Sequence, residues 1–160
     1  MQDEKTARAN AVFASLCQML DERDWKYSKD EEKLRVNGVI HGEDIPIEFI
    51  MLVEKDMEFV QFLSFLPFEV PEDKRAEMAI AVCAANYGFA NGSFDFNVMG
   101  SGKIIFRLTT SYRGDSKLSA DLFEYMLVVA AMSTDKYNDK FFLLSKGNIT
   151  LQQFLTDISN

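Results

Sequence analysis

The residues of this chain that could support catalysis are few and lie far apart. His41 is the only histidine, and Glu43 and Asp44 follow it closely enough to orient an imidazole that acts as a general base. A general base needs a nucleophile or a substrate group placed beside it, and this loop supplies no candidate. We therefore interpret His41 as a surface residue, and we predict that the chain has no catalytic residues and is not an enzyme.

Three adjacent carboxylates, Asp30, Glu31 and Glu32, are the second candidate for chemistry. Carboxylates hold a metal ion when further ligands converge on the same point, and nothing downstream in the sequence supplies matching ligands. The stretch is typical of a solvated turn. We predict no metal site.

Residues 100–103 (GSGK) are similar to part of a phosphate-binding loop. The complete motif requires a glycine where this chain has Asn97, and a serine or threonine where it has Ile104. The motif also precedes a helix, whereas the residues after this turn alternate like a strand. We predict no nucleotide site and no cofactor.

The two cysteines, Cys17 and Cys83, lie in apolar stretches with helical spacing. A disulfide framework requires more cysteines, and the paired spacing of zinc ligands is absent. We expect both side chains to be buried, reduced thiols in a cytoplasmic protein.

Length and charge narrow the classes of partner. A chain of 160 residues with 48% hydrophobic residues predicts a single domain over residues 1–160. Its 17 basic and 25 acidic residues give a net charge of −8, which disfavours nucleic acids and anionic membranes as partners. The sequence contains neither an apolar secretory signal at its start nor a run of about 18 apolar residues that could span a membrane.

Hydrophobic periodicity predicts an α+β fold, an antiparallel sheet with helices in the order α-β-β-β-α-β-β-α and a short additional helix. The predicted elements are a helix over 6–24, strands over 33–41, 45–53 and 59–70, a helix that Pro71 opens and that ends near Tyr87, strands over 93–99 and 103–112, a helix from Ser119 or Ala120 to Leu144, and a short helix that Thr150 caps.

The second helix has an apolar stripe at helical spacing, formed by Ala76, Ala79, Ile80, Cys83 and Tyr87. Its many alanines allow a close approach to a neighbouring element. We predict that this stripe packs against the sheet.

The stretch 45–70 is the most informative part of the chain, because its strands are apolar on both faces. In the first strand the odd positions from Ile45 to Val53 are all apolar, and Ile50 and Leu52 interrupt the polar residues at the even positions. The second strand is apolar on both faces as well. A sheet covered on one face only should alternate apolar and polar residues, so a helix layer, a second copy of the chain or a partner protein must cover the second face.

The register of this hairpin decides which residues share the second face. The connecting loop has two, three or four residues, and a slip of one residue exchanges the faces of a strand. We predict that Ile50, Leu52, Val60 and Phe62 form a partner-binding surface. Charged substitutions at Ile50 and Phe62 should then disrupt association and leave the chain folded.

Glycines and aromatic residues spread over most of the chain carry a family resemblance. They are Trp25 after the first helix, the helix that Pro71 leads and that closes on Asn86, residues 92–95 (GSFD), Phe106 with Arg107, and residues 134–137 (TDKY) in the long helix. With these marks the chain resembles the YbjN family of bacterial proteins, whose fold is that of type III secretion chaperones.

The resemblance implies a cytoplasmic, non-enzymatic protein with a role in sensory or stress regulation. Secretion chaperones of this fold are small acidic dimers that hold an extended segment of a client across their sheets. We therefore expect a homodimer, or an adaptor or chaperone-like regulator that binds a protein or peptide client through its apolar sheet face. The alternative hypothesis is a sensory regulator that binds a small molecule between the long C-terminal helix and the sheet.

Overall fold

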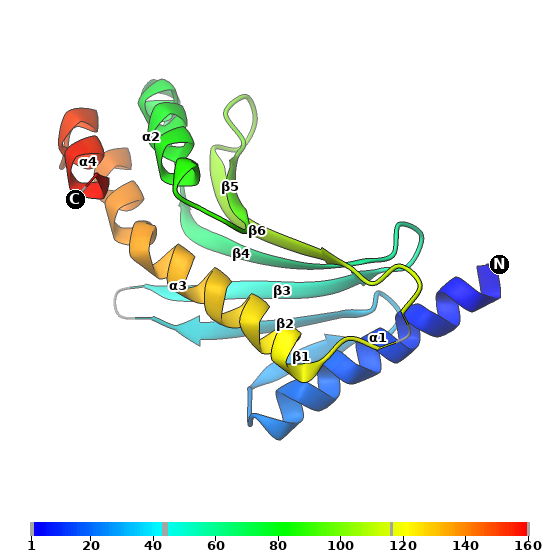
Figure 1. Ribbon diagram of the computed structural model, residues 1–160. Helices are drawn as coiled ribbons and strands as arrows, with labels where there is room; N and C mark the ends of the chain where they lie inside the picture. The colour runs from blue at the N-terminus through cyan, green and yellow to red at the C-terminus, as the bar shows by residue number, and fades with distance from the viewer. Residues whose placement is uncertain (1, 43–44, 116, 160) are drawn as a thin grey trace.

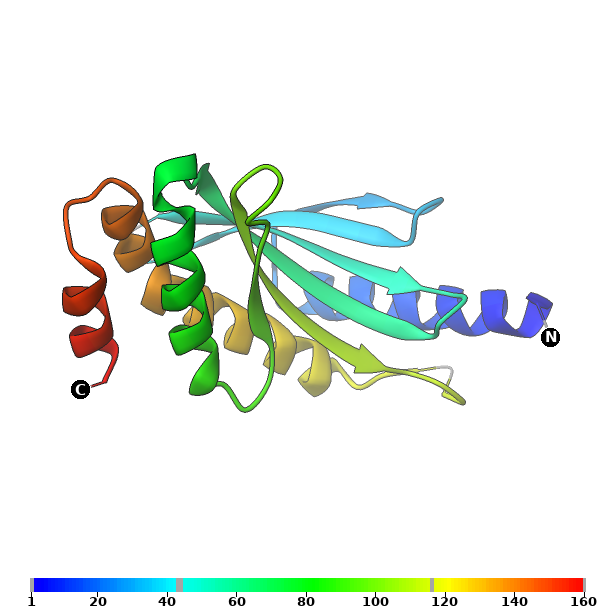
Figure 2. The ribbon, with the colours of Figure 1, turned by 90° about the horizontal axis from the view of Figure 1, so that it is seen from above.

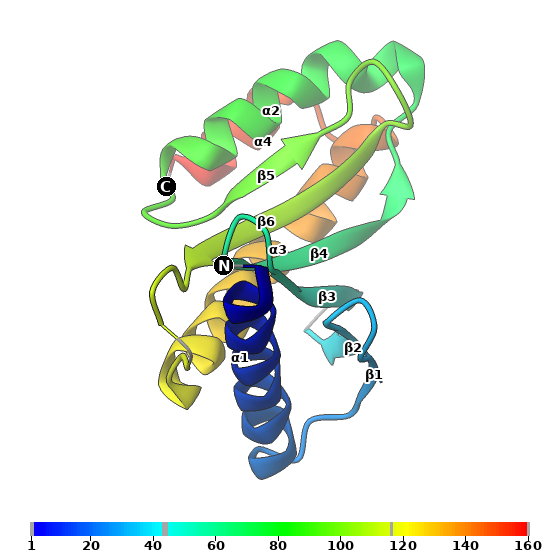
Figure 3. The same ribbon diagram turned by 90° about the vertical axis from the view of Figure 1, so that its right-hand side faces the viewer.

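A six-stranded antiparallel sheet in the order β1-β2-β3-β4-β6-β5 forms the frame of the molecule. The computed structural model describes residues 2–42, 45–115 and 117–159. The short strands β1 and β5 lie at the two edges of the sheet (Figure 3). The strands are β1 (Tyr27–Asp30), β2 (Arg35–His41), β3 (Pro46–Glu54), β4 (Phe59–Glu69), β5 (Ser93–Phe96) and β6 (Lys103–Ser111).

The helices of the described chain are α1 (Gln2–Glu22), the short 3-10 turn η1 (Glu72–Lys74), α2 (Arg75–Tyr87), α3 (Ala120–Ser145) and α4 (Leu151–Ile158). Helix α3 runs diagonally across the sheet, and α1 and α2 lie toward opposite ends of the molecule (Figure 1). Helix α4 packs beside α2. The two ends of the chain lie at opposite ends of the molecule (Figure 2). Helices α1 and α3 contact the central strands, whereas α2 contacts β5.

Helices α1 and α3 cover the same face of the sheet, and α2 lies at its β5 edge. The odd residues of β3 from Ile47 to Val53 are buried, and so are the even residues of β4 from Val60 to Leu66 and of β6 from Ile104 to Leu108. The strand register places these buried positions opposite one another, so they form one layer beneath the helices. We call this the covered face.

The predicted order of helices and strands is confirmed, and the structure adds one short edge strand, β1. Local signals in the sequence set the helix ends. Ser119 Oγ accepts a hydrogen bond from the Leu122 N–H at 3.2 Å, and Thr150 forms a reciprocal capping box with Gln153. Pro71 precedes the turn η1, so α2 itself begins only at Arg75.

An aromatic cluster fills the space between α3 and the β5–β6 end of the sheet. The Phe94 ring lies 5.1 Å from the rings of Phe106 and Phe141, measured between centroids, and 5.7 Å from that of Tyr137. Phe141 in turn stacks on Phe154 of α4 at 5.4 Å. Burial of these rings joins α3 and α4 to the sheet.

At the other end of the sheet, Trp25 closes the end of α1 onto the covered face. Its ring meets Phe49 edge-on at 6.4 Å, and Phe49 stacks on Phe62 at 5.3 Å. A Cβ at Gly38 would lie 2.6 Å from the Phe49 ring, so only glycine leaves room for it. Trp25 therefore seals the end of α1 onto the sheet, and β2 approaches the Phe49 ring closely at Gly38.

The turn between β3 and β4 has four residues, 55–58, and it sets the register of the central hairpin. Glu54 pairs with Phe59, Ile50 with Leu63 and Met51 with Phe62. In this register, the wholly apolar side of β3 lies on the covered face together with Phe62.

Glu58 ties this turn to α1. Its backbone has a φ of 59°, and its side chain is only 4% exposed. Arg8 Nε donates a hydrogen bond to its carboxylate at 2.9 Å, and the Lys5 and Arg113 cations lie 3.8 and 4.0 Å away. The hydrogen bond from Arg8 is the main reason why the pKa of Glu58 lies below its usual range.

The predicted apolar stripe of α2 is on the wrong side of the helix. The residues that pack inward are Met78, Ala81, Val82 and Ala85. Ile80 is 53% exposed, Tyr87 is 96% exposed and Cys83 is also exposed. Helix α2 is apolar around most of its circumference, so periodicity alone selected the wrong side. The prediction that both thiols are buried is therefore wrong for Cys83, and Cys17 is only half-buried.

Two polar contacts hold α2 and α3 to the sheet. Asn86 Nδ2 donates to the Phe94 carbonyl at 2.9 Å, and the Phe94 N–H donates to Asn86 Oδ1 at 2.7 Å, so this side chain pairs with the outer edge of β5. Inside the covered face, the hydroxyls of Ser64 and Thr134 are hydrogen bonded at 2.6 Å.

Candidate functional site

The second face of the sheet carries no helix in the described parts of the chain, and we call it the open face. Its side chains come from the even positions of β3 and from the odd positions of β2, β4 and β6. Val39 is 43% exposed, and the other apolar members are half-buried by their neighbours. The apolar residues of the open face on these four strands are Val39, Ile50, Leu52, Phe59, Leu63, Phe65 and Ile105.

The register arranges these residues in rows that cross the strands. One row runs from Val39 through Glu48 and Phe65 to Ile105. The next row contains Asn37, Ile50, Leu63 and Arg107. Side chains directly opposite each other in adjacent strands are close enough to touch, so the rows form a continuous apolar strip across the middle of the sheet.

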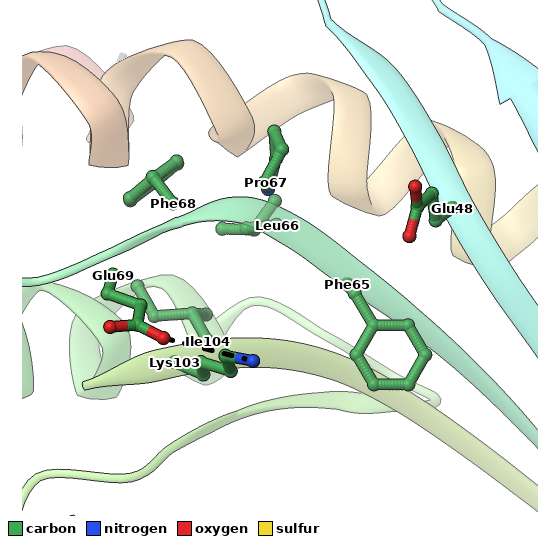
Figure 4. Close-up of a pocket in the computed structure, with 8 residues that line it drawn as sticks. All are labelled: Glu48, Phe65, Leu66, Pro67, Phe68, Glu69, Lys103 and Ile104. Atoms are coloured by element: carbon green, nitrogen blue, oxygen red, sulfur yellow. Dashed lines mark ion pairs between the residues drawn. The ribbon is translucent and has the colours of Figure 1, made fainter. Parts of the chain in front are cut away.

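A bulge in β4 creates a cavity at one end of this strip. Phe65 pairs with Ile105 and Glu69 pairs with Lys103, so three residues of β4 face one residue of β6 between the two pairs. Pro67 lies in this bulge, where its missing N–H costs no ladder hydrogen bond. The resulting cavity has a volume of about 460 Å³ (Figure 4). It is lined by Glu48, Phe65, Leu66, Pro67, Phe68, Glu69, Lys103 and Ile104.

Two further depressions continue this cavity across the sheet. One, of about 370 Å³, shares Glu48 and Phe65 with it and extends over Ile50 to Val39. The other, of about 490 Å³, lies at the β1 edge, reaches His41 and shares Val39 with the second. Together they form a groove that crosses the strands from β1 to β6.

Several charged side chains on the strands of the open face are paired within the chain. Arg107 Nη2 lies 2.6 Å from a carboxylate oxygen of Asp95, and Arg35 lies 3.5 Å from Asp30. Lys103 lies 3.8 Å from Glu69 at the rim of the bulge cavity, as Figure 4 shows.

Glu48 differs from these residues. It is exposed, lies between Val39 and Phe65 in the strand register, and lines both central depressions. Among the described residues it has no ion pair and no hydrogen bond from its side chain. A single unpaired carboxylate therefore lies in the middle of the apolar strip.

The structure divides the four predicted partner-binding residues between the two faces. Ile50 and Leu52 lie on the open face, half-buried. Val60 and Phe62 are 0% exposed and lie on the covered face, so they are core residues and cannot reach a partner in this fold. Placing Phe62 beside Ile50 was wrong by a register slip of one residue.

Leu63, Phe65 and Ile105 belong to this surface as well, although they were not predicted to be part of it. The alternation of Leu63 and Phe65 with the other apolar residues of β4 is visible in the sequence. The turn length is needed to decide which of the two sets lies on the open face. Glu48 is one of the polar residues at the even positions of β3, and its apolar surroundings depend on neighbours from two other strands, β2 and β4.

The residues considered for chemistry are not brought together. His41 lies at the β1 end of the groove, while Glu43 and Asp44, the carboxylates proposed to orient it, lie outside the described residues. Asp30 pairs with Lys33 and Arg35, and Glu31 with Lys29. Within the described ranges, no group of three or more His, Cys, Asp or Glu residues could hold a metal ion. Residues 100–103 form the turn between β5 and β6, and a strand follows them.

The space proposed for a small molecule, between α3 and the sheet, is filled by side chains. Phe123, Met126 and Phe141 of α3 are 0% exposed. None of the cavities described above has a lining residue from α3.

Most of this chain matches a known protein family and a solved structure. The family model of YbjN, described as "Putative bacterial sensory transduction regulator", matches residues 13–143. The chain belongs to the YbjN family. A crystal structure of YbjN from E. coli, described as "a putative transcription regulator", is similar with a TM-score of 0.55 and 13% sequence identity, and the match covers 80% of this chain and 92% of that one. No match was found among the curated proteins.

The residues that carry the YbjN resemblance have structural roles here. Asn86 binds the edge of β5, Phe106 belongs to the aromatic cluster, and Thr134 bonds to Ser64 in the core. The Asp135 carboxylate lies against Gly42, where an added Cβ would be 2.1 Å from Oδ1. These marks therefore preserve the fold and do not identify the binding surface. Among the described residues, no helix has both the length and the apolar character needed to cross a bilayer.

Proposed function

We propose that this chain is a non-enzymatic protein-binding module of a regulatory adaptor, and that the open face of its sheet receives a segment of a partner protein. The observation that carries the proposal is the apolar strip on a sheet face that no described helix covers. Exposed apolar areas of this kind, rimmed by polar residues, are typical of protein interaction sites. The description of the YbjN family as regulators supports the same class of function.

The form of the surface favours a chain segment over a small molecule. The groove is open along its length and crosses several strands, whereas sites for small molecules are usually concave and enclose most of the ligand. The space between α3 and the sheet, which the alternative hypothesis requires, is filled by buried aromatic and aliphatic side chains. A small-molecule sensor is therefore the weaker candidate.

The test uses two matched substitutions on opposite sides of the molecule. Ile50→Glu places a charge in the middle of the apolar strip. Ile80→Glu makes the same change on the outer side of α2, where the side chain is 53% exposed and lies away from the sheet. Circular dichroism and urea unfolding establish that both variants are folded.

The probe is a phage-displayed library of random dodecapeptides, selected on the immobilised full-length protein. Enriched peptides are then synthesised, and their binding is measured by fluorescence anisotropy. We expect them to bind wild type and Ile80→Glu equally and to lose measurable binding to Ile50→Glu. The proposal is contradicted if no peptide is enriched, or if the enriched peptides bind Ile50→Glu as tightly as wild type.

Sedimentation velocity of the wild type and both variants tests the second copy as an occupant. A dimer that Ile50→Glu dissociates and Ile80→Glu leaves intact would make the open face a self-association surface. It would also overturn the assignment of a partner protein to this face.

A further inference from the structure

We infer that the partner segment presents a lysine or arginine flanked by apolar side chains, and that Glu48 is the residue that recognises this cation. The inference rests on the proposed function, because it specifies what the open face binds. It is carried by the position of Glu48 within the apolar strip and by the charges around it.

Among the residues that the structure describes, the Glu48 carboxylate is isolated from other charges. Four other acidic side chains belong to the strands of the open face, and each has a partner within the chain. Asp30, Glu69 and Asp95 pair with basic side chains, and Glu54 accepts a hydrogen bond from the Asp56 N–H at 3.0 Å. In the described parts of the chain, Glu48 alone of these five has none.

Covering the Glu48 carboxylate with a partner costs free energy unless the partner supplies a cation. An occupant of the apolar strip also covers Glu48, since Val39, Ile50 and Phe65 surround it in the strand register. A carboxylate that is removed from water without a partner is strongly unfavourable. A purely apolar segment is therefore rejected, whereas a segment with a cation at this point replaces the lost water with a charge-assisted hydrogen bond.

The cation is more easily supplied by another protein than by a second copy of this chain. A second copy of this chain is a poorer donor, because three basic side chains of its open face, Arg35, Lys103 and Arg107, already pair with acidic neighbours, and the fourth, Lys26, lies at the β1 edge. The net charge of −8 also opposes close approach of two copies. A basic segment of another protein has the complementary charge.

The groove also sets the length of the segment. It spans β1, β2, β3, β4 and β6, which is four steps between neighbouring strands. At about 4.8 Å a step this is about 19 Å, or about six residues of extended chain. Glu48 lies on the middle strand of the five, so the cation belongs near the centre of that segment.

The experiment repeats the peptide selection on Glu48→Gln, with Glu54→Gln as the control. The control residue lies on the same strand and the same face, and the change removes the same charge. We expect peptides selected on wild type and on Glu54→Gln to combine apolar residues with a central lysine or arginine. Peptides selected on Glu48→Gln should stay apolar and lose the basic residue, and Glu48→Arg should select acidic residues in its place.

A binding measurement then isolates the pair. A selected peptide and its Lys→Gln or Arg→Gln form are titrated against wild type and Glu48→Gln. We expect the neutral peptide to bind wild type about tenfold more weakly, and the two peptides to bind Glu48→Gln within a factor of about two of each other.

The outcomes separate this inference from the proposed function. Apolar peptides that need Ile50 but show no basic preference would overturn the role of Glu48 and leave the open face as the binding surface. Peptides whose binding is unaffected by Ile50→Glu, or a selection that yields none, would overturn the proposed function itself. A basic preference that persists on Glu48→Gln would assign the recognition to another carboxylate.

Discussion

Both faces of the central hairpin carry several apolar side chains, but their surroundings differ. On the covered face, Phe62 stacks on Phe49 beneath the helices and is 0% exposed. On the open face, the next residue of the same strand, Leu63, is half-buried beside Ile50. The comparison shows that apolar character alone does not separate residues that hold the fold together from residues that are available to a partner.

The largest test of this contrast is a pair of alanine substitutions in adjacent residues. Phe62→Ala removes a fully buried ring, and we expect the free energy of unfolding to fall by about 3–5 kcal/mol. Leu63→Ala should lower it by less than about 1 kcal/mol, since that side chain is already partly in water. Urea unfolding followed by circular dichroism measures both. Equal losses would mean that the open face is also covered in the isolated protein.

Hydrogen bonds on the two faces should differ in the same direction. Ser64→Ala leaves the buried Thr134 hydroxyl without its 2.6 Å partner, and we expect a loss of about 1–3 kcal/mol. The double variant Ser64→Ala/Thr134→Val should lose less than the sum of the two single changes. Gln61→Ala removes an exposed 3.1 Å bond to Thr109 on the open face and should change stability by less than about 0.5 kcal/mol. A larger effect of Gln61→Ala would contradict the contrast.

The buried carboxylate of Glu58, which binds Arg8 of α1, should make the stability of the chain depend on pH. The pKa of Glu58 is lower in the folded chain than the ordinary value of 4.5, mainly because of its hydrogen bond from Arg8. The folded state then binds fewer protons than the unfolded state, so the stabilisation is present above about pH 4.5 and is lost as the pH falls through the folded pKa.

Unfolding of wild type and Glu58→Gln by urea at pH 7 and at pH 3 checks this. The variant should be less stable at pH 7, and the difference should shrink at pH 3. Asp95→Asn, which breaks an exposed ion pair on the open face, should change stability by only about 0–1 kcal/mol at pH 7. A Glu58→Gln difference that is the same at both pH values would argue against the ionised carboxylate as the cause.

The smallest effect is expected on the outer side of α2. Cys83 is exposed, whereas Cys17 is half-buried and burial raises the pKa of its thiol. Because the thiolate is the reactive form, the folded protein should show one fast and one slow thiol toward Ellman's reagent at pH 8. Cys83→Ser should remove the fast phase and change stability by less than about 0.5 kcal/mol. Two equally fast thiols would show that α1 does not shield Cys17.

Local patterns in the sequence were sufficient for the elements themselves. Helices begin at the predicted places after Ser119 and Thr150, and the order of strands and helices is the predicted one apart from the added edge strand β1. Such features depend on backbone sterics and on neighbours a few residues away, which the sequence contains. The YbjN resemblance was carried by the same kind of structural residue.

The sequence by itself also determined that the hairpin is apolar on both faces, and therefore that one of them needs an explanation. Only the tertiary structure decided which residues belong to which face. A turn of four residues pairs Ile50 with Leu63, whereas a slip of one residue would have paired it with Phe62 and exchanged the faces of β4. For α2 the tertiary structure likewise chose the inward side of a helix that is apolar nearly all round. In both cases the alternatives bury similar local surface, so the choice depends on contacts between segments far apart in the chain, such as Arg8 with Glu58 and Asn86 with Phe94.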